Sequence, residues 1–352
     1  MISAGLVDLV QCPDCRGRIV AAPGGYACSN CQRRFDSAHG YLDLRPREAF
    51  EEQTKYLDEA LHADARHEAI APPLLGSKIR NDMLRRFLAP GSGDRIIDLG
   101  CGSGRTLVWN ADSGAAVTGV DIAPYFAPDA VAKADVLLGD LRRLPLRDGA
   151  FGKAWSLDVL EHMSRPALIA MLREANRVLA DEGALFVYTH VRKNGWIAGG
   201  TRLVNKFAAF CERLGLLDLS QERLRKSDHV NPLTDHDDLA KAAAESGFRI
   251  ERVTYYTPIV GAFVENVLVR IAEKALTRRH ARPTSSGATP DRGDATRAAR
   301  RQAQARVKRG GALYGALMVV SWVMRIDIIC FGRMRSGPFF ALLRKTGVPP
   351  LA

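Results

Sequence analysis

The chain has 352 residues, seven of them cysteine, and a formal net charge of +11. Hydrophobic residues make up 47 % and charged residues 25 %, which excludes a disordered chain and is typical of a folding, mostly soluble protein. The length suits one large domain with additions. The N-terminus lacks a basic start and a sustained apolar run, so we expect no secretion signal and a cytoplasmic protein.

Four cysteines near the N-terminus have the spacing C-x2-C-x12-C-x2-C, and they are Cys12, Cys15, Cys28 and Cys31. Each CxxC turn directs two thiolates at one point, and two such turns provide the tetrahedral sulfur set that Zn²⁺ prefers. We therefore predict a structural zinc ribbon over residues 1–47, with a disulfide or redox role as the alternative. A closed set of four thiolates leaves no open position for metal chemistry.

A helical connector is predicted over residues 48–92, and its clearest helix is the amphipathic stretch "LLGSKIRNDMLRRFL". From Arg95 onward, strand and helix patterns alternate. Five strands are expected, in "RIIDLG", "AAVTGVDI", "ADVLLGD", "FGKAWSLDVL" and "GALFVYTHV". A helix begins at Ser164, with Gly183 placed after its end. This alternation predicts an α/β fold with a doubly wound, Rossmann-like parallel sheet.

Residues 192–233 read as an insertion. Their apolar stripe of Leu203, Phe207, Phe210 and Leu214 predicts a helix, either packed on the core or covering a substrate. A helix capped by Thr234 and ended by Gly247 follows, and a sixth strand starts at Phe248. Further helices are expected over 259–276 and 311–324. The apolar run of the second is shorter than a membrane span needs, so we expect it to be interfacial or buried.

The positive charge is concentrated in residues 278–310, where ten arginines and lysines face two aspartates. This segment carries +8 of the net +11. Its first part is rich in Arg, Ala, Ser, Thr and Gly without an apolar period, which predicts a disordered linker. The plainest interpretation is a solvated linker. The alternatives are contact with the phosphates of RNA or with an anionic membrane surface.

A glycine loop follows the first strand, with Gly100, Gly102 and Gly104 in "DLGCGSG". Such a loop lets a ligand approach the main chain closely, but it does not by itself identify the ligand. Acidic residues end three successive strands. Asp98 can bind an ammonium group, Asp121 the two hydroxyls of a ribose, and Asp140 lies within reach of an adenine amine. These acids favour a cationic nucleoside amino acid over a pyrophosphate.

Residues 93–191 resemble the class I S-adenosylmethionine (SAM)-dependent methyltransferases of the broad small-molecule and lipid group. The motifs that carry this resemblance are "DLGCGSG", "VDIA", "LPLRDGAFGKAWSLDVLEHM" and "REANRVLADEGALFVYT". The chain has "LADEGA" where that family usually has "L-K-P-G-G". The resemblance implies a cofactor pocket formed by Asp98, Gly100, Cys101, Gly102, Gly104, Asp121, Ile122, Asp140, Leu141 and Leu157.

The same family adds an antiparallel seventh strand beside the fifth, and residues 337–347 match it. The methyltransferase domain would then extend over 93–352, with insertions at 192–233 and 259–336. Methyl transfer is an in-line displacement in which the protein mainly positions the reactants. If the acceptor must lose a proton, His190 and His162 are the candidate bases. His229, His236 and Asp158 are weaker candidates.

Two hypotheses differ in the acceptor. In the first, the enzyme methylates a small or lipid-like molecule and its apolar helices rest on the inner face of a membrane as a peripheral contact. In the second, the zinc ribbon and the basic linker hold RNA, because the ribbon is similar to that of ribosomal RNA guanine methyltransferases. The linker has no interleaved aromatic residues for base stacking, so we favour the first. A non-enzymatic interaction protein is disfavoured by the three intact acids, and the ribbon's partner is left open.

Overall fold

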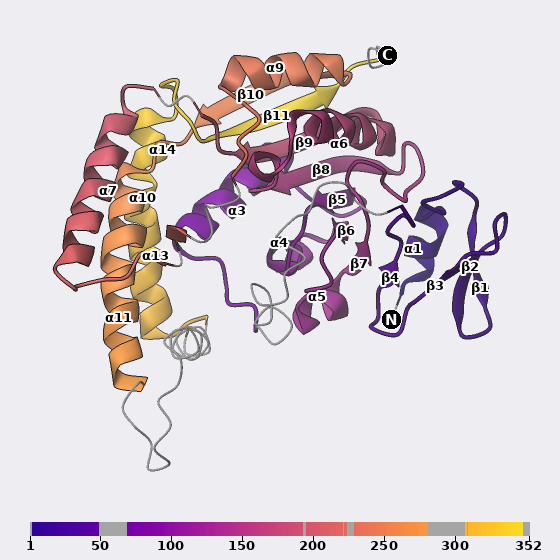
Figure 1. Cartoon of the computed structure of the whole chain (residues 1–352), viewed down its shortest axis with the longest axis horizontal. Coiled ribbons are helices and arrows are strands. Elements are labelled where there is room, and N and C mark those ends of the chain that lie inside the picture. Colours follow the sequence, from indigo (N-terminus) through magenta and orange to yellow (C-terminus); the bar gives the residue numbers. More distant parts are fainter. Residues whose placement is uncertain are drawn as a thin grey trace.

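The computed structural model describes residues 2–48, 69–192, 195–220, 222–223, 229–280, 307 and 309–347. One eight-stranded sheet organises this part of the chain, with helices on both faces (Figure 1). Most of the basic segment 278–310 and part of the predicted connector 48–92 lie outside the described residues.

The sheet has the strand order β10-β11-β9-β8-β5-β6-β7-β4. The strands are β4 (Leu42–Asp43), β5 (Arg95–Leu99), β6 (Ala116–Asp121), β7 (Asp135–Leu138), β8 (Phe151–Leu157), β9 (Leu179–Thr189), β10 (Phe248–Tyr255) and β11 (Phe339–Lys345). Strand β11 is antiparallel to both β9 and β10, and the other pairs are parallel. The predicted antiparallel strand beside the fifth is therefore confirmed.

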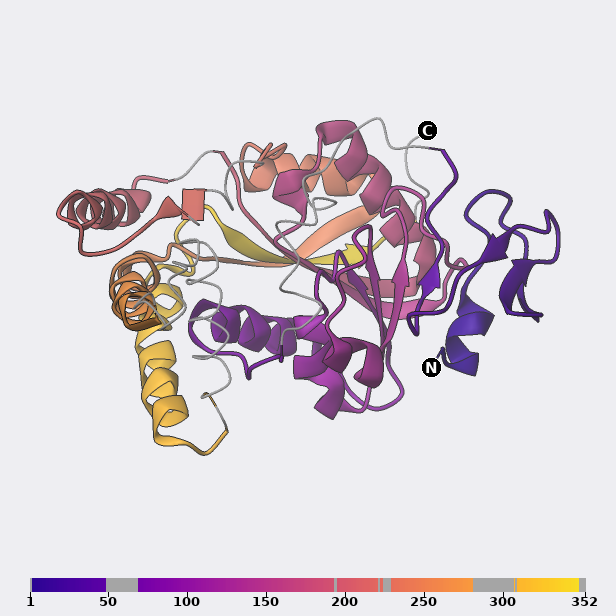
Figure 2. The same ribbon diagram turned by 60° about the horizontal axis from the view of Figure 1, so that its bottom comes forward.

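Two layers of helices cover the sheet. One face carries α6 (Arg165–Val178) and α9 (His236–Glu245), and the other carries α3 (Leu75–Leu88), α4 (Arg105–Asn110) and α5 (Pro128–Lys133), as Figure 2 shows. Strand β8 is buried at Phe151, Ala154 and Trp155, because both faces of a central parallel strand are covered. This layering brings the carboxyl ends of β5, β6, β7 and β8 to one edge, where a doubly wound fold binds its ligand.

The N-terminal segment forms α1 (Ala4–Leu9) and a small antiparallel sheet of β1 (Ile19–Ala22), β2 (Gly25–Cys28) and β3 (Arg34–Phe35). It then contributes β4 to the large sheet, where Leu42 pairs with Leu137 and the Leu44 N–H donates to the Leu138 carbonyl at 2.9 Å. The sheet therefore has eight strands, one more than the seven predicted. A two-residue strand gives no readable alternation in sequence.

Two helix boundaries differ from the sequence prediction. Helix α6 ends at Val178, because Leu179 already pairs with Phe151 in the sheet. Gly183 therefore lies inside β9 rather than after the helix. Helix α9 is capped by Asp235 instead of Thr234, since the Asp235 carboxylate accepts from the Asp238 N–H at 3.1 Å.

At the carboxyl end of β10 lies a helical layer, drawn at the left of Figures 1 and 2. It comprises α7 (Ala198–Arg213), α10 (Ile259–Phe263), η5 (Val264–Leu268), α11 (Val269–His280), α13 (Ala312–Met324) and α14 (Ile326–Phe331). The helix predicted in the first insertion is present as α7, but its stripe from Leu203 to Leu214 is exposed instead of packed on the core. Small buried residues, Ala208 and Cys211, form its packed side.

Candidate functional site

The glycine loop turns directly from β5 into α4. Gly100, Gly102 and Gly104 all have positive φ, at 83°, 54° and 82°, a conformation that favours glycine. A Cβ on Gly100 would lie 2.5 Å from Val159, and one on Gly104 would lie 2.3 Å from the Cβ of Ala130. At Gly102, in contrast, a Cβ would meet no atom within 4 Å. Two glycines therefore allow close packing, while the third faces open space in which a ligand can approach the main chain.

Two acidic side chains flank this loop. Asp98 is 2 % exposed, and its Oδ2 atom has no hydrogen-bond partner among the described residues. Burial raises the pKa of Asp98 to about 7, and the charge of the nearby Asp121 carboxylate acts in the same direction. An orphaned buried carboxylate oxygen beside an open glycine fits an ammonium ligand, because such a group satisfies the lone pair and favours the ionised acid.

Asp121 fixes the loop as well as facing it. Its Oδ2 atom accepts from the Gly102 N–H at 2.7 Å, and its Oδ1 atom accepts from the Ala123 N–H at 2.9 Å. Burial raises the pKa of Asp121. A carboxylate at the end of the second strand, directed toward the glycine loop, is placed as a ribose-binding residue requires.

Asp140 follows β7 on the same edge of the sheet, and it is 9 % exposed. Its carboxylate accepts from the backbone N–H of Arg142 at 2.9 Å and from the Nε of Arg142 at 3.2 Å. Arg177 of α6 holds the loop that carries Asp140 by hydrogen bonds to its backbone. Arg177 donates to the carbonyls of Leu144 and Leu146, at 2.9 and 2.7 Å.

The remaining predicted cofactor residues lie on the same edge but differ in environment. Ile122 directly follows β6, and Leu157 ends β8; both are partly buried. Leu141 packs against the main hydrophobic core. The Cys101 side chain is 9 % exposed and belongs to the core on the α3 side of the sheet, so only its backbone contributes to the loop. Cys211 and Cys330 lie in the helical layer, on α7 and α14.

A polar cluster lies where β8 and β9 end, and Val159 connects it to the glycine loop. His190 places its Nε2 atom 3.8 Å from the Asp158 Oδ1 and 3.9 Å from the Glu161 Oε1. Glu161 is 1 % exposed and accepts from the Thr189 hydroxyl at 3.0 Å. Burial, followed by the charge of Asp158, raises the pKa of Glu161 to about 8. The cluster can thus hold and move a proton.

His162 and His229 complete the cluster, with ring centroids 4.7 Å apart in an edge-to-face arrangement. The ligand atoms of Glu161, His162 and His229 lie within 4.8 Å of one another, and so do those of Asp158, Glu161 and His190. The cluster is therefore compact enough to bind a cation as well as a proton. His236 lies elsewhere, at the start of α9, 3.1 Å from Asp237.

Sequence reasoning did not identify Glu161 or Arg80 as site residues. Arg80 of α3 lies 3.5 Å from the Asp158 carboxylate and stacks over the Tyr188 ring at 5.6 Å. Glu161 could have been found from its place in "LEHM", one residue before a candidate histidine. Arg80 could not have been found in this way. The amphipathic pattern of α3 shows which of its side chains are polar, but not which strand of the sheet they lie near.

The four N-terminal cysteines converge in the structure. The Cys12 and Cys31 sulfurs are 3.7 Å apart, the Cys15 and Cys28 sulfurs 3.5 Å, and all four lie within 4.8 Å of one another. Tetrahedral zinc with bonds of about 2.3 Å separates its sulfurs by roughly 3.8 Å. These side chains fit a tetrahedral metal, and backbone N–H groups of Asn30 and Cys31 donate to the Cys28 sulfur.

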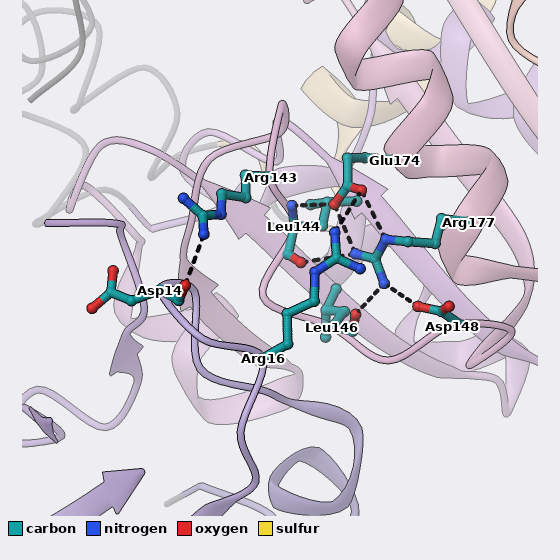
Figure 3. Close-up of polar contacts among 8 residues, drawn as sticks. All are labelled: Asp14, Arg16, Arg143, Leu144, Leu146, Asp148, Glu174 and Arg177. Atoms are coloured by element: carbon teal, nitrogen blue, oxygen red, sulfur yellow. Dashed lines mark hydrogen bonds and ion pairs between the residues drawn. The ribbon is translucent and has the colours of Figure 1, made fainter. Parts of the chain in front are cut away.

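The cysteine-bearing segment packs on the large domain, as Figure 3 shows. Arg143 donates to the Asp14 carbonyl at 2.8 Å, and Arg16 lies 3.7 Å from Glu174. Glu174 in turn accepts two hydrogen bonds of 2.7 Å from Arg177 and one from the Leu144 N–H. Apolar residues on both sides, among them Cys12, Ile19 and Leu146, share one core.

Residues 97–187 match the protein family described as a methyltransferase domain. A 27-O-demethylrifamycin SV methyltransferase of Amycolatopsis mediterranei is 35 % identical over 30 % of this chain and 41 % of the relative. The sterol 4-C-methyltransferase strm-1 of Caenorhabditis elegans is 30 % identical over 28 % of this chain and 32 % of the relative. A ubiquinone biosynthesis O-methyltransferase of Escherichia fergusonii is 27 % identical over 41 % of this chain and 69 % of the relative.

These similarities centre on the sheet edge described above. The chain spans less than half the length of the first two relatives. The family match begins within β5, one residue before Asp98, and ends within β9. The match therefore contains the glycine loop, the strand-end acids Asp98, Asp121 and Asp140, and Glu161. It does not contain the cysteine cluster or the helical layer.

Proposed function

We propose that this chain, which carries a class I SAM-dependent methyltransferase domain, transfers the methyl group of SAM to a hydroxyl of a small or lipid-like acceptor. The observation that supports this most directly is the placement of His190, directly after β9, at 3.8 and 3.9 Å from the carboxyl groups of Asp158 and Glu161. A hydroxyl acceptor needs a base, whereas many other acceptors do not. The names of two of the relatives above refer to O-methylation. The third is a sterol 4-C-methyltransferase, which agrees with a lipid-like acceptor but is named for methylation at carbon.

SAM, when bound, supplies the activated methyl carbon. Asp98 would bind its ammonium group, Asp121 its ribose, and the loop of Asp140 and Leu141 its adenine. His190 accepts the acceptor's proton, and the Asp158 carboxylate, 3.8 Å from its Nε2 atom, stabilises the imidazolium that results. Arg80 lies 3.5 Å from the Asp158 carboxylate and holds it in place, so it acts on the reaction through Asp158.

The function is tested with methyl-labelled SAM and a whole-cell extract, followed by partition of the label. We expect the label in the organic phase. Label in a nuclease-sensitive fraction would instead favour RNA, which none of the comparisons supports. With the acceptor in hand, His190→Ala should lower kcat about 100-fold or more while the Kd for SAM is unchanged. His236→Ala is the matched control, and equal activity of both variants would refute the role of His190.

We also propose that the four cysteines bind one structural Zn²⁺, which completes a ribbon too small to hold a core alone. The convergence of four thiols at tetrahedral spacing supports this. Elemental analysis of the purified chain should give one zinc per molecule, and Cys28→Ser should lose it. A metal-free protein with an intact fold would exclude the assignment. The cytoplasmic location predicted from the sequence is tested by cell fractionation.

A further inference from the structure

The helical layer exposes far more large apolar side chains than the rest of the described molecule. Trp322 is 65 % exposed, Ile329 78 %, Leu203 69 % and Trp196 79 %. Others of the same kind are Phe207, Phe210, Leu214, Leu216, Phe263, Leu268, Ile271, Leu313, Val319, Val323 and Ile326. Apart from this layer and the segments that flank α7, which carry Trp196, Leu214 and Leu216, the large exposed apolar residues of the described chain are Val20 and Val230. Such a concentration marks an interaction surface.

The exposed residues follow helical stripes on neighbouring helices. On α7 the stripe runs through Leu203, Phe207 and Phe210, and on α13 and α14 it includes Val319, Trp322 and Ile326. The helices α7, α10–α11 and α13 lie side by side in both views (Figures 1 and 2). The Phe207 and Phe263 rings stack at 6.5 Å, so the stripes of α7 and α10 are continuous.

The charges beside these stripes are positive. Arg202, Lys206 and Arg213 are exposed on α7, and Arg325 and Arg333 are exposed around α14. The acids of the layer's helices each have a polar partner: Glu265 accepts from the Gly76 N–H at 3.1 Å, and Glu273 accepts from Arg270. Glu212 pairs with Arg223 at 2.8 Å, and Asp327 accepts from the Val260 and Gly261 N–H groups at 3.0 and 2.8 Å. Asp218, which follows α7, is exposed.

An apolar surface bordered by exposed cations complements an anionic lipid bilayer. A soluble protein partner would have to cover this surface with apolar side chains and place acids opposite the cations. Nothing in the described residues points to such a partner. We propose that the helical layer docks on an anionic bilayer, with its helices lying in the plane of the interface.

The segment Ala312–Phe331 is long and apolar enough to cross a membrane, and 17 % of its most apolar window is buried. It is also longer than the predicted run 311–324, because α14 continues α13 after Arg325. Polar contacts nevertheless hold it to the protein: the Leu75 N–H donates to the Ser321 hydroxyl at 2.7 Å, and Asp327 caps α10. A crossing helix would abandon these bonds and bury Arg325 in lipid, which favours the in-plane arrangement.

Docking of this kind would bring the polar cluster close to the lipid. Helix α13 packs on α3, and the Gly76 N–H of α3 donates to Glu265 of the helical layer at 3.1 Å. The same α3 carries Arg80, which contacts Asp158. An apolar acceptor dissolved in the bilayer would therefore reach the cluster from the α3 side. This last step rests on the proposed function; the docking itself does not.

The test is co-flotation of the full chain with two kinds of vesicle, phosphatidylcholine alone and phosphatidylcholine with phosphatidylglycerol. We expect binding to the anionic vesicles. The binding should weaken in 0.5 M salt, because the Debye length falls from about 8 Å at 0.15 M toward roughly 3 Å at 1 M. The double variant Trp322→Glu/Ile329→Glu should bind at least tenfold less, and so should Leu203→Glu/Phe210→Glu. Val20→Glu, on the ribbon, is the matched control and should bind like the native chain.

All substituted side chains are exposed, so the variants should fold and bind SAM with native affinity. This binding assay involves no methyl transfer, so failure of the docking and failure of the proposed activity give different results. Equal flotation of variants and native chain would overturn the proposal. So would absent flotation together with an oligomer that the variants convert to a monomer, since a second copy would then cover the surface. Resistance to alkaline carbonate extraction would indicate a spanning helix and overturn the in-plane arrangement.

Discussion

The guanidinium of Arg143 donates a hydrogen bond of 2.8 Å to the backbone carbonyl of Asp14, and so joins the loop after β7 to the first cysteine turn (Figure 3). Asp140, a predicted cofactor residue, lies in the same loop, three positions before Arg143. The cysteine-bearing segment is thus attached to the part of the molecule that should bind adenine. This attachment gives the ribbon a defined partner, namely the domain that follows it in the same chain.

Chelation of the metal should therefore destabilise the whole molecule. The ribbon and the large domain share one core, so we expect a single unfolding transition whose Tm falls by about 3 °C for each roughly 2 kcal/mol lost. Calorimetry with and without a chelator measures this. Two separate transitions, with the upper one unchanged, would show that the ribbon folds independently.

Gly104→Ala and Gly102→Ala should separate stability from cofactor binding. A methyl group at Gly104 would lie 2.3 Å from Ala130, so we expect a loss of about 2–3 kcal/mol in the free energy of unfolding. A methyl group at Gly102 meets no protein atom, so this variant should lose only about 1 kcal/mol through its positive φ. It should bind SAM much more weakly, however. Urea unfolding and titration calorimetry give the two quantities, and unchanged SAM affinity in Gly102→Ala would contradict the site.

The affinity for SAM should depend on pH through Asp98. Its pKa of about 7 in the ligand-free protein means that binding an ammonium group requires loss of a proton below neutrality. The ammonium itself stays protonated there, with a pKa of about 8. Lowering the pH from 7 to 6 should raise the Kd about fivefold, as the neutral fraction of Asp98 grows. Asp98→Asn should bind weakly at both values, and a native profile without slope would show that Asp98 is already ionised.

Arg177→Lys should loosen the loop that carries Asp140. Arg177 satisfies Glu174, Asp148 and two carbonyls at once, which a lysine cannot do. We expect a loss of about 2–4 kcal/mol in unfolding free energy and a higher Kd for SAM. Arg147→Lys, exposed in the same loop, is the control. Equal effects of the two substitutions would show that the loop does not depend on the hydrogen bonds of the Arg177 guanidinium group.

Sequence reasoning reached the parts of the fold that local patterns encode. The buried strands around Asp98 and Asp121 and the glycine loop were predicted, because apolar runs and glycines report local geometry. The antiparallel strand at residues 337–347 was predicted from the resemblance to the methyltransferase family. The pairing of Leu42 with Leu137 was not, since it joins two short segments far apart in the chain. Arg80 was missed for the same reason: only the folded arrangement brings α3 to the end of β8.

The short strand β4 has a consequence for how the protein can be dissected. It covers the outer edge of β7, whose backbone groups would otherwise face solvent in a row open to pairing with another chain. A fragment trimmed to the methyltransferase domain from residue 93 would expose that edge together with the apolar surface beneath Leu42 and Leu44. Such a fragment should aggregate. The N-terminal segment therefore protects the exposed edge of the sheet from pairing with another chain.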